Sequence, residues 1–245
     1  MNRNQAVPEE NGIPLWRSTL PGRPLTGLTV LVVEDSRFAS EAVRLLCLRS
    51  GARIRRADCL RTAARHLQTY RPAVVIVDMG LPDGDGAELI ARMAALQPRV
   101  PVVLGMSGDP DRESAALAAG AHGFLAKPVD SLAQFQHVIL SALPPEAQPA
   151  GLRVVNAETV HPDRAALHDD LAHVADALSS ASDTGAIEYI ARFLAGVARS
   201  ARDESLEEAA TALARDHQAG RALAADLARI SGLVQDRLGT ARALY

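Results

Sequence analysis

Residues 73–86 read Ala73-Val-Val-Ile-Val-Asp78-Met-Gly-Leu-Pro-Asp-Gly-Asp-Gly86, and this stretch decides the fold. Its first five residues are apolar and mostly β-branched, which is typical of a strand buried on both faces of a parallel sheet. The run ends in the carboxylate of Asp78, and a loop dense in glycine, proline and aspartate follows. The stretch therefore predicts a parallel sheet with an acidic side chain where a buried strand meets a loop.

Three further apolar runs also end in polar side chains. The runs and the residues that follow them are Leu28–Val33 with Glu34 and Asp35, residues 102–106 with Ser107, and residues 121–126 with Lys127. In open α/β sheets, ligands bind beyond the carboxyl ends of the strands. We therefore expect these polar groups to converge on one crevice.

Lys127 is the only lysine among the 26 basic residues of the chain. The planar guanidinium of arginine and the compact ammonium of lysine are not interchangeable at a tight anionic site. Because Lys127 also lies at the predicted crevice, we interpret it as a ligand for an anionic group rather than as a chance surface residue.

Helical patterns separate the apolar runs. Apolar residues recur with a period close to 3.6 at residues 37–50, 59–70, 87–96, 114–119 and 132–143. The alternation gives five βα units between residues 27 and 143. We therefore predict an α/β fold, a five-stranded parallel doubly wound sheet with right-handed crossovers, followed by a second, all-helical C-terminal domain.

Residues 27–144 resemble the receiver domain of bacterial two-component response regulators. Four elements carry the resemblance: Val-Val-Glu34-Asp35-Ser, Val-Asp78-Met-Gly-Leu-Pro82-Asp-Gly-Asp-Gly86, Met-Ser107-Gly and Phe124-Leu-Ala-Lys127-Pro128. Each element alone is a weak signal, but their order on the expected strands is specific. The resemblance implies a flavodoxin-like sheet, and a protein that catalyses only its own phosphorylation and dephosphorylation rather than an enzyme for other substrates.

The resemblance also implies a role for each side chain of the crevice. Asp78 would be the phosphoacceptor, whose carboxylate attacks phosphorus to give an acyl phosphate. Lys127 and Ser107 would contact phosphoryl oxygens, and Ser107 and Phe124 would form the conformational switch. A cis peptide bond is implied between Lys127 and Pro128.

Magnesium is the implied cofactor. Asp35 and Asp78, with Glu34 directly or through water and the backbone carbonyl of Gly80, would hold Mg²⁺, which prefers oxygen ligands in near-octahedral geometry. Three crowded carboxylates repel one another, so a bound cation and Lys127 would relieve that repulsion. Three neighbouring polar residues are instead assigned to helix caps and turns: Ser36, Asp83 and Asp85.

Four segments are expected along the 245 residues. They are a flexible tail at 1–25, the receiver domain at 26–144, a linker at 145–159, and a helical bundle or dimerisation domain at 160–245. Apolar spacings that alternate between four and three residues suggest a coiled-coil-like seam, which Gly220, Gly232 and His217 weaken; if the helix is continuous over 206–242, it is roughly 55 Å long at 1.5 Å per residue. A helix that long needs a partner, so we expect a homodimer through the helical domain or binding to another protein.

Charge and apolar content exclude some partners. The net charge of −3 divides into +1 for residues 1–150 and −4 for residues 151–245. An acidic second half argues against a DNA-binding output domain, so no nucleic-acid partner is expected. No apolar stretch approaches 18 residues, which argues against a membrane span. We expect a cytoplasmic protein with reduced, buried Cys47 and Cys59, whose partner is a sensor histidine kinase or a phosphotransfer protein.

Three other functions were weighed against this one. A phosphorelay protein whose helical domain is a histidine phosphotransfer-like module would use His168, but no clear phosphotransfer motif surrounds that residue. A phosphatase of the haloacid dehalogenase type needs a carboxylate two residues after the nucleophile, where Gly80 stands. A receiver-like module that is never phosphorylated is disfavoured because all five polar crevice residues are present.

Overall fold

A five-stranded parallel sheet forms the centre of the first domain. The computed structural model describes residues 22–148, 156–180 and 184–242. The strands lie in the order β2-β1-β3-β6-β7 and every pair is parallel. Their bounds are β1 Thr29–Val33, β2 Arg53–Ala57, β3 Val74–Asp78, β6 Val102–Ser107 and β7 Gly123–Ala126. This order confirms the predicted doubly wound topology.

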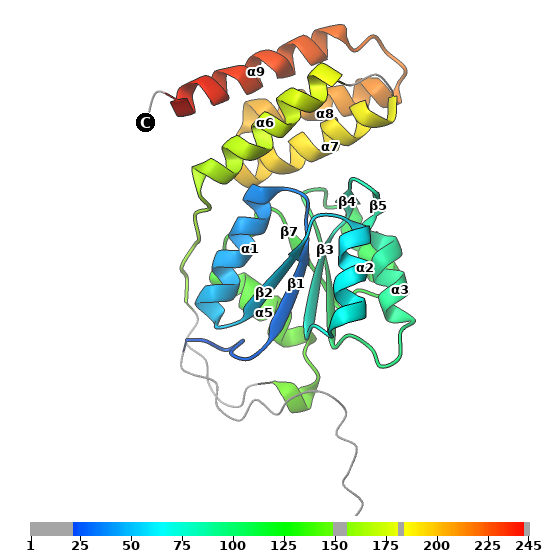
Figure 1. Cartoon of the computed structure of the whole chain (residues 1–245), viewed down its shortest axis with the longest axis vertical. Coiled ribbons are helices and arrows are strands. Elements are labelled where there is room, and N and C mark those ends of the chain that lie inside the picture. Colours follow the sequence, from blue (N-terminus) through cyan, green and yellow to red (C-terminus); the bar gives the residue numbers. More distant parts are fainter. Residues whose placement is uncertain (1–21, 149–155, 181–183, 243–245) are drawn as a thin grey trace, which may run out of the picture.

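Helices cover both faces of the sheet, as Figure 1 shows. On one face lie α1 (Arg37–Ser50) and α5 (Leu132–Ala142), and on the other lie α2 (Leu60–Thr69), α3 (Gly86–Ala94) and α4 (Arg112–Ala118). Along β1, Val30 and Val32 join the core of the first face, whereas Leu31 and Val33 join the core of the second. Because both faces are covered, the central strands are apolar without alternation.

The edge strand β2 has no apolar run, and its sequence did not mark it as a strand. Three of its five side chains are exposed arginines, Arg53, Arg55 and Arg56. A strand at the edge of a sheet has fewer apolar neighbours to pack against, and charged side chains there discourage pairing with other chains. A short antiparallel hairpin of β4 (Gly80–Leu81) and β5 (Gly84–Asp85) follows β3.

The second domain is a four-helix bundle. After a 3₁₀ turn at Pro145–Ala147, the chain forms α6 (Arg164–Ser180), α7 (Thr184–Ala201), α8 (Glu204–Gln218) and α9 (Ala224–Arg242). Helix α6 contacts α7 and α9, and α8 contacts the same two helices. The bundle therefore closes on itself around one core, whose buried members include Ile190, Leu194, Leu213, Ile230 and Val234.

The predicted seam does not lie on one continuous helix over 206–242. Helix α8 ends at Gln218, α9 begins at Ala224, and Gly220 between them has φ +64°, a conformation that glycine adopts with little strain. Because α9 packs back on α8, Leu213 and Val234 of the predicted seam are buried within one chain. In the described part of the chain, no helix is both long and apolar enough to cross a membrane.

The bundle lies over the carboxyl ends of the strands (Figure 1), and α6 and α7 both contact α1. The segment that leads into the bundle also packs on the first domain. Thr159 forms an isolated bridge with Ser131, and Val160 is buried in the core beneath α1 and α5. Leu25, at the end of the predicted tail, is fully buried in the same core. Residues 1–21 of that tail and residues 149–155 of the predicted linker lie outside the described residues.

Candidate functional site

Three carboxylates meet where β1 and β3 end. Glu34 and Asp35 follow β1, and Asp78 is the last residue of β3. Each of them offers an oxygen atom, and these atoms lie within 4.8 Å of one another. Glu34 is 2% exposed and Asp78 is 6% exposed, whereas Asp35 is only half-buried, so the cluster reaches solvent at Asp35. The structure thus brings together the acidic residues that the sequence placed at separate strand ends.

Lys127 supplies the cation of the cluster. Its Nζ lies 2.7 Å from Glu34 Oε2 and 2.7 Å from Asp78 Oδ1, and its side chain is 6% exposed. The Lys127–Pro128 peptide is cis, which confirms the prediction. Burial alone would lower the pKa of Lys127, but attraction by Asp78 and Glu34 outweighs burial and raises that pKa. The ammonium is therefore charged throughout the physiological range.

One ammonium does not offset three carboxylates. Burial raises the pKa of Glu34 well above its ordinary value, and repulsion by Asp78 and Asp35 adds to the effect against the attraction of Lys127. The pKa of Asp35 rises to about 6, first through burial and then through repulsion by Asp78. These shifts show that the folded protein holds the carboxylates at an electrostatic cost that an added cation would reduce.

Backbone groups fix the carboxylates in place. The amide of Gly80 donates to Asp78 Oδ2 at 2.9 Å. The amide of Ser36 donates to Glu34 Oε1 and to Asp35 Oδ1, at 3.1 and 3.0 Å. Gly86 packs so closely that a Cβ on it would lie 2.1 Å from the carbonyl oxygen of Asp78. A side chain at position 86 is therefore incompatible with the present position of Asp78.

The donors of the cluster suit a hard divalent cation. All three are carboxylates, and oxygen-only ligand sets are the kind that Mg²⁺ prefers. The Gly80 amide bonds to Asp78, which keeps that loop next to the cluster. The use of the Gly80 carbonyl as a ligand stays a prediction.

Ser107 and Phe124 lie beside this cluster on neighbouring strands. The carbonyl oxygen of Ser107 accepts a hydrogen bond from the Lys127 amide at 2.8 Å, and its Oγ accepts one from the Asp109 amide at 3.1 Å. Phe124 is half-buried and packs on Gly105, where a Cβ would lie 3.0 Å from its ring. Their positions next to Lys127 suit the predicted switch, whose operation stays a prediction.

The three residues assigned to caps and turns all cap helices. Ser36 Oγ accepts from the amide of Ala39 at the start of α1, and Asp85 accepts from Ala87 at the start of α3. Asp83 caps α2 from a distant part of the chain, by accepting from the amides of Leu60 and Arg61. Side-chain oxygens at these positions satisfy helix amides that lack a backbone partner.

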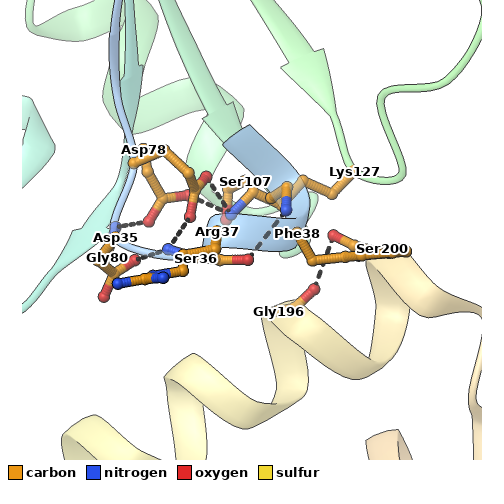
Figure 2. A network of polar contacts seen from close by, with 12 residues as sticks. Asp35, Ser36, Arg37, Phe38, Asp78, Gly80, Ser107, Lys127, Gly196 and Ser200 are labelled. Carbon is orange, nitrogen blue, oxygen red and sulfur yellow. Dashed lines mark hydrogen bonds and ion pairs between the residues drawn. The ribbon is translucent and has the colours of Figure 1, made fainter. Parts of the chain in front are cut away.

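The sequence did not reveal that the bundle takes part in the site. The hydroxyl of Tyr189 on α7 donates to Asp35 Oδ2 at 2.9 Å. Asp170 on α6 is 3% exposed and accepts hydrogen bonds from Ser36 Oγ and from the amides of Arg37 and Phe38. Figure 2 shows α7 passing close to Asp35, Asp78 and Lys127, with Gly196 on the side that faces them. Nothing in the helical periodicity indicates which face of α7 would meet another domain.

Comparison with known proteins identifies the family of the first domain. The family described as the response regulator receiver domain matches this chain over residues 30–139. Residues 30–139 form a response regulator receiver domain. The match includes β1 to β7 and most of α5, and it ends before the bundle.

Named relatives are similar to the receiver domain. The KDP operon transcriptional regulatory protein KdpE of Escherichia coli is 34% identical over 99 residues, which cover 40% of this chain and 44% of KdpE. The virulence transcriptional regulatory protein PhoP of Salmonella typhimurium strain LT2 is 33% identical over 103 residues, 41% of this chain and 46% of PhoP. A crystal structure of a putative response regulator from Chloroflexus aurantiacus is 26% identical with a TM-score of 0.45, and the match covers 47% of this chain and 96% of that one. The chain spans less than half the length of these curated relatives.

Proposed function

We propose that the protein is a two-component response regulator that accepts a phosphoryl group on Asp78. The ion pair between Lys127 Nζ and Asp78 Oδ1 at 2.7 Å, beside the carboxylates of Glu34 and Asp35, carries the proposal. A carboxylate acts here as nucleophile, and the ammonium beside it balances charge on the phosphoryl oxygens.

The transfer forms one bond and breaks one. A carboxylate oxygen of Asp78 bonds to phosphorus, and the phosphorus–nitrogen bond of a phosphohistidine donor breaks. The imidazole nitrogen keeps the electron pair of that bond. Water later attacks the acyl phosphate, which restores the carboxylate of Asp78 and releases inorganic phosphate. The protein therefore turns over only its own phosphoryl group and is not an enzyme for other substrates.

Mg²⁺ is the cofactor that we assign to the cluster. Asp35 and Asp78 would hold it, with Glu34 directly or through water and the Gly80 carbonyl. When bound, the cation neutralises charge on the transferring phosphoryl oxygens. Lys127 neutralises the opposite side of the phosphoryl group, and the Gly80 amide keeps Asp78 in position for attack.

Ser107 and Phe124 would report the phosphoryl group to the rest of the domain. The hydroxyl of Ser107, now bonded to the Asp109 amide, would turn to a phosphoryl oxygen. Phe124 lies one strand away and is only half-buried, so it has room to follow.

The bundle would act through protein contacts rather than DNA. Residues 151–245 carry a net charge of −4, which disfavours binding to a polyanion. KdpE and PhoP are named as transcriptional regulators, but the family match ends at residue 139 and does not extend to the bundle. We assign the bundle to binding another protein, and we assign the chain to the cytoplasm, where a sensor histidine kinase or a phosphotransfer protein would supply the phosphoryl group.

A phosphotransfer role for the bundle itself is not favoured. The helix that faces the acidic cluster is α7, and its residues at the site are Tyr189 and Gly196 rather than histidine. His168 lies on α6 and lines an open groove of about 1330 Å³ beside α1. The phosphoryl donor is therefore expected on another molecule.

Treatment with phosphoramidate and Mg²⁺ tests the proposed function. Intact-mass analysis should show a phosphoryl adduct on the wild-type protein and none on Asp78→Asn. Lys127→Arg should lose most of the adduct while circular dichroism shows a folded protein, because the larger guanidinium does not match the buried position of the ammonium. Asp83→Asn is the matched control, since Asp83 lies in the same loop but caps α2. An adduct on Asp78→Asn equal to that of the wild type would remove Asp78 from this role.

A further inference from the structure

The bundle packs on the proposed phosphorylation site through one buried and one partly buried polar contact. Asp170 accepts three hydrogen bonds at the start of α1, at 2.8 Å from Ser36 Oγ, 2.9 Å from the Arg37 amide and 3.0 Å from the Phe38 amide. Its carboxylate therefore lies at the positive end of a helix dipole and supplements the cap from Ser36. Tyr189 makes the second contact, from its hydroxyl to Asp35 Oδ2.

Helix α7 passes close to the cation of the site (Figure 2). A Cβ on Gly196 would lie 3.9 Å from Lys127 Nζ, which is ordinary van der Waals contact. Three residues further on, Arg199 rests on the backbone of Gly108, where a Cβ would lie 2.5 Å from its Nη1. Arg199 is held by Glu207 through bonds of 2.7 and 2.5 Å. Helix α7 thus packs on the loop after β6 through Arg199 and passes close to the ammonium of Lys127 at Gly196.

Two exposed ion pairs also join the domains, Arg37 with Asp169 and Arg202 with Asp130. The Arg37 and Asp169 side chains are 66% and 50% exposed, and the Arg202 side chain is 69% exposed. Exposed pairs of this kind contribute little to stability because water and salt screen them. Beside the packing of α6 and α7 on α1, the polar contacts of Tyr189 and Asp170 are therefore the ones best shielded from water.

We propose that docking of the bundle and phosphorylation of Asp78 exclude each other, with Tyr189 and Asp170 as the latch. The inference rests on the proposed function. A phosphoryl group adds phosphorus and three oxygens, with about −1.5 to −2 charges, next to Lys127. Helix α7 borders Lys127 on one side, where a Cβ on Gly196 would lie 3.9 Å from Nζ, and the open groove borders it on another. In addition, a cation bound by Asp35 would share or take the oxygen that Tyr189 now contacts.

Movement of the loop after β6 would act in the same direction. Ser107 and Gly108 are adjacent, so a turn of Ser107 toward the phosphoryl group shifts the backbone on which Arg199 rests. Binding linkage is reciprocal: if the docked bundle weakens occupancy of the site, occupancy of the site weakens docking by the same factor. The docked bundle restrains phosphorylation, and phosphorylation frees the α6–α7 face for a protein partner.

Titration of full-length protein with beryllofluoride at fixed Mg²⁺ tests this inference by calorimetry. A hydrogen bond to a charged group is worth enough that its loss changes an equilibrium about tenfold. The concentration of beryllofluoride for half-saturation should therefore fall about tenfold in Tyr189→Phe and in Asp170→Asn. The matched controls should behave as wild type. They are Tyr70→Phe, whose hydroxyl bonds His66 at the end of α2, and Asp169→Asn, the exposed neighbour of Asp170.

Hydrogen exchange gives a second, direct readout on the same samples. With Mg²⁺ and beryllofluoride, the wild-type amides of residues 36–38 and 189–202 should exchange faster, because Asp170 leaves α1 and α7 leaves the site. The inference is overturned, while the proposed function stands, if all five proteins need the same concentration of beryllofluoride for half-saturation. It is also overturned if these amides exchange more slowly when beryllofluoride binds. If Tyr189→Phe needs a higher concentration of beryllofluoride for half-saturation than the wild type, Tyr189 supports the cation site. That result also overturns the inference. Failure of beryllofluoride to bind any of the proteins, as in Asp78→Asn, overturns the proposed function and the inference together.

Discussion

At the scale of single residues, the acidic cluster is held against its own repulsion. Three carboxylates share one ammonium in a largely buried site, and the pKa values of Glu34 and Asp35 are both raised as a result. Functional sites commonly retain such unfavourable arrangements because the function needs them. Removing one of the charges should therefore stabilise the fold even as it damages the site.

Asp35→Asn should stabilise the metal-free protein at neutral pH. The folded pKa of Asp35 is about 6, above the ordinary 3.8, so its ionised form opposes folding above pH 6 and not below about pH 4. We expect a gain of about 1–2 kcal/mol at pH 7.5, or about 2–4 °C in Tm for each kcal/mol, shrinking toward zero near pH 4. The single oxygen of asparagine can still accept the bond from the Ser36 amide, and its NH2 group can donate to the Tyr189 hydroxyl.

Thermal unfolding in EDTA at the two pH values measures this effect. Asp111→Asn is the control, because Asp111 is exposed at the start of α4 and makes no side-chain cap. A Tm of Asp35→Asn that equals or falls below that of the wild type at pH 7.5 would contradict the expected repulsion.

The acidic cluster could be predicted from the sequence, whereas the packing of the helical bundle on it could not. Glu34, Asp35, Asp78 and Lys127 each follow a buried apolar run, and the carboxyl ends of parallel strands share one edge of the sheet. Tyr189 comes from a helix whose apolar face packs in its own bundle. The contact of a polar side chain of α7 with another domain depends on how the surfaces of the two folded domains fit together. Helical periodicity within one domain carries no information on that fit.

At the scale of elements, glycine positions explain how tightly the loops of the site pack. Gly86 opens α3 against the backbone of Asp78, and Gly105 of β6 lies against Ala116 and Phe124. Two elements also show where the apolar pattern of the sequence fails to predict the secondary structure. The edge strand β2 is too polar to be recognised by an apolar run, and the apolar spacing of residues 206–242 continues across the turn that separates α8 from α9.

Gly86→Ala and Gly232→Ala should have opposite effects although both are glycines of helices. Alanine normally stabilises a helix interior by about 0.5–1 kcal/mol, and Gly232 of α9 has no atom within 4 Å of a built Cβ, so that gain should appear there. At Gly86 the Cβ would lie 2.1 Å from a backbone oxygen that cannot swing away, and overpacking should cost about 1–3 kcal/mol. Denaturant unfolding measures both, and a neutral or stabilising Gly86→Ala would show that the backbone of Asp78 can move.

At the scale of the whole molecule, the closed bundle changes what the output is expected to be. The sequence suggested a long helix in need of a second subunit. The structure instead buries Leu213 and Val234 within one chain, and the bundle meets the receiver domain at α1 rather than through α5. We therefore expect the output to depend on whether the α6–α7 face packs on the receiver domain or is exposed to a partner. The apolar residues that suggested a dimer already pack within the bundle of one chain.

The full-length protein should be monomeric and should expand when the site is occupied. Light scattering should give the mass of one 25.9 kDa chain with and without Mg²⁺ and beryllofluoride, because the bundle core is complete in one copy. Small-angle scattering should show a larger radius of gyration only in the occupied state, since the bundle then leaves the carboxyl ends of the strands. A shift of the open population from 1% to half needs only about 2.7 kcal/mol of differential binding, which one phosphoryl group with its ion pair can supply.

The variant Tyr189→Phe should be partly expanded before any addition, and Tyr70→Phe should not. A doubled mass on adding beryllofluoride would instead show that the freed α6–α7 face binds a second copy of the chain.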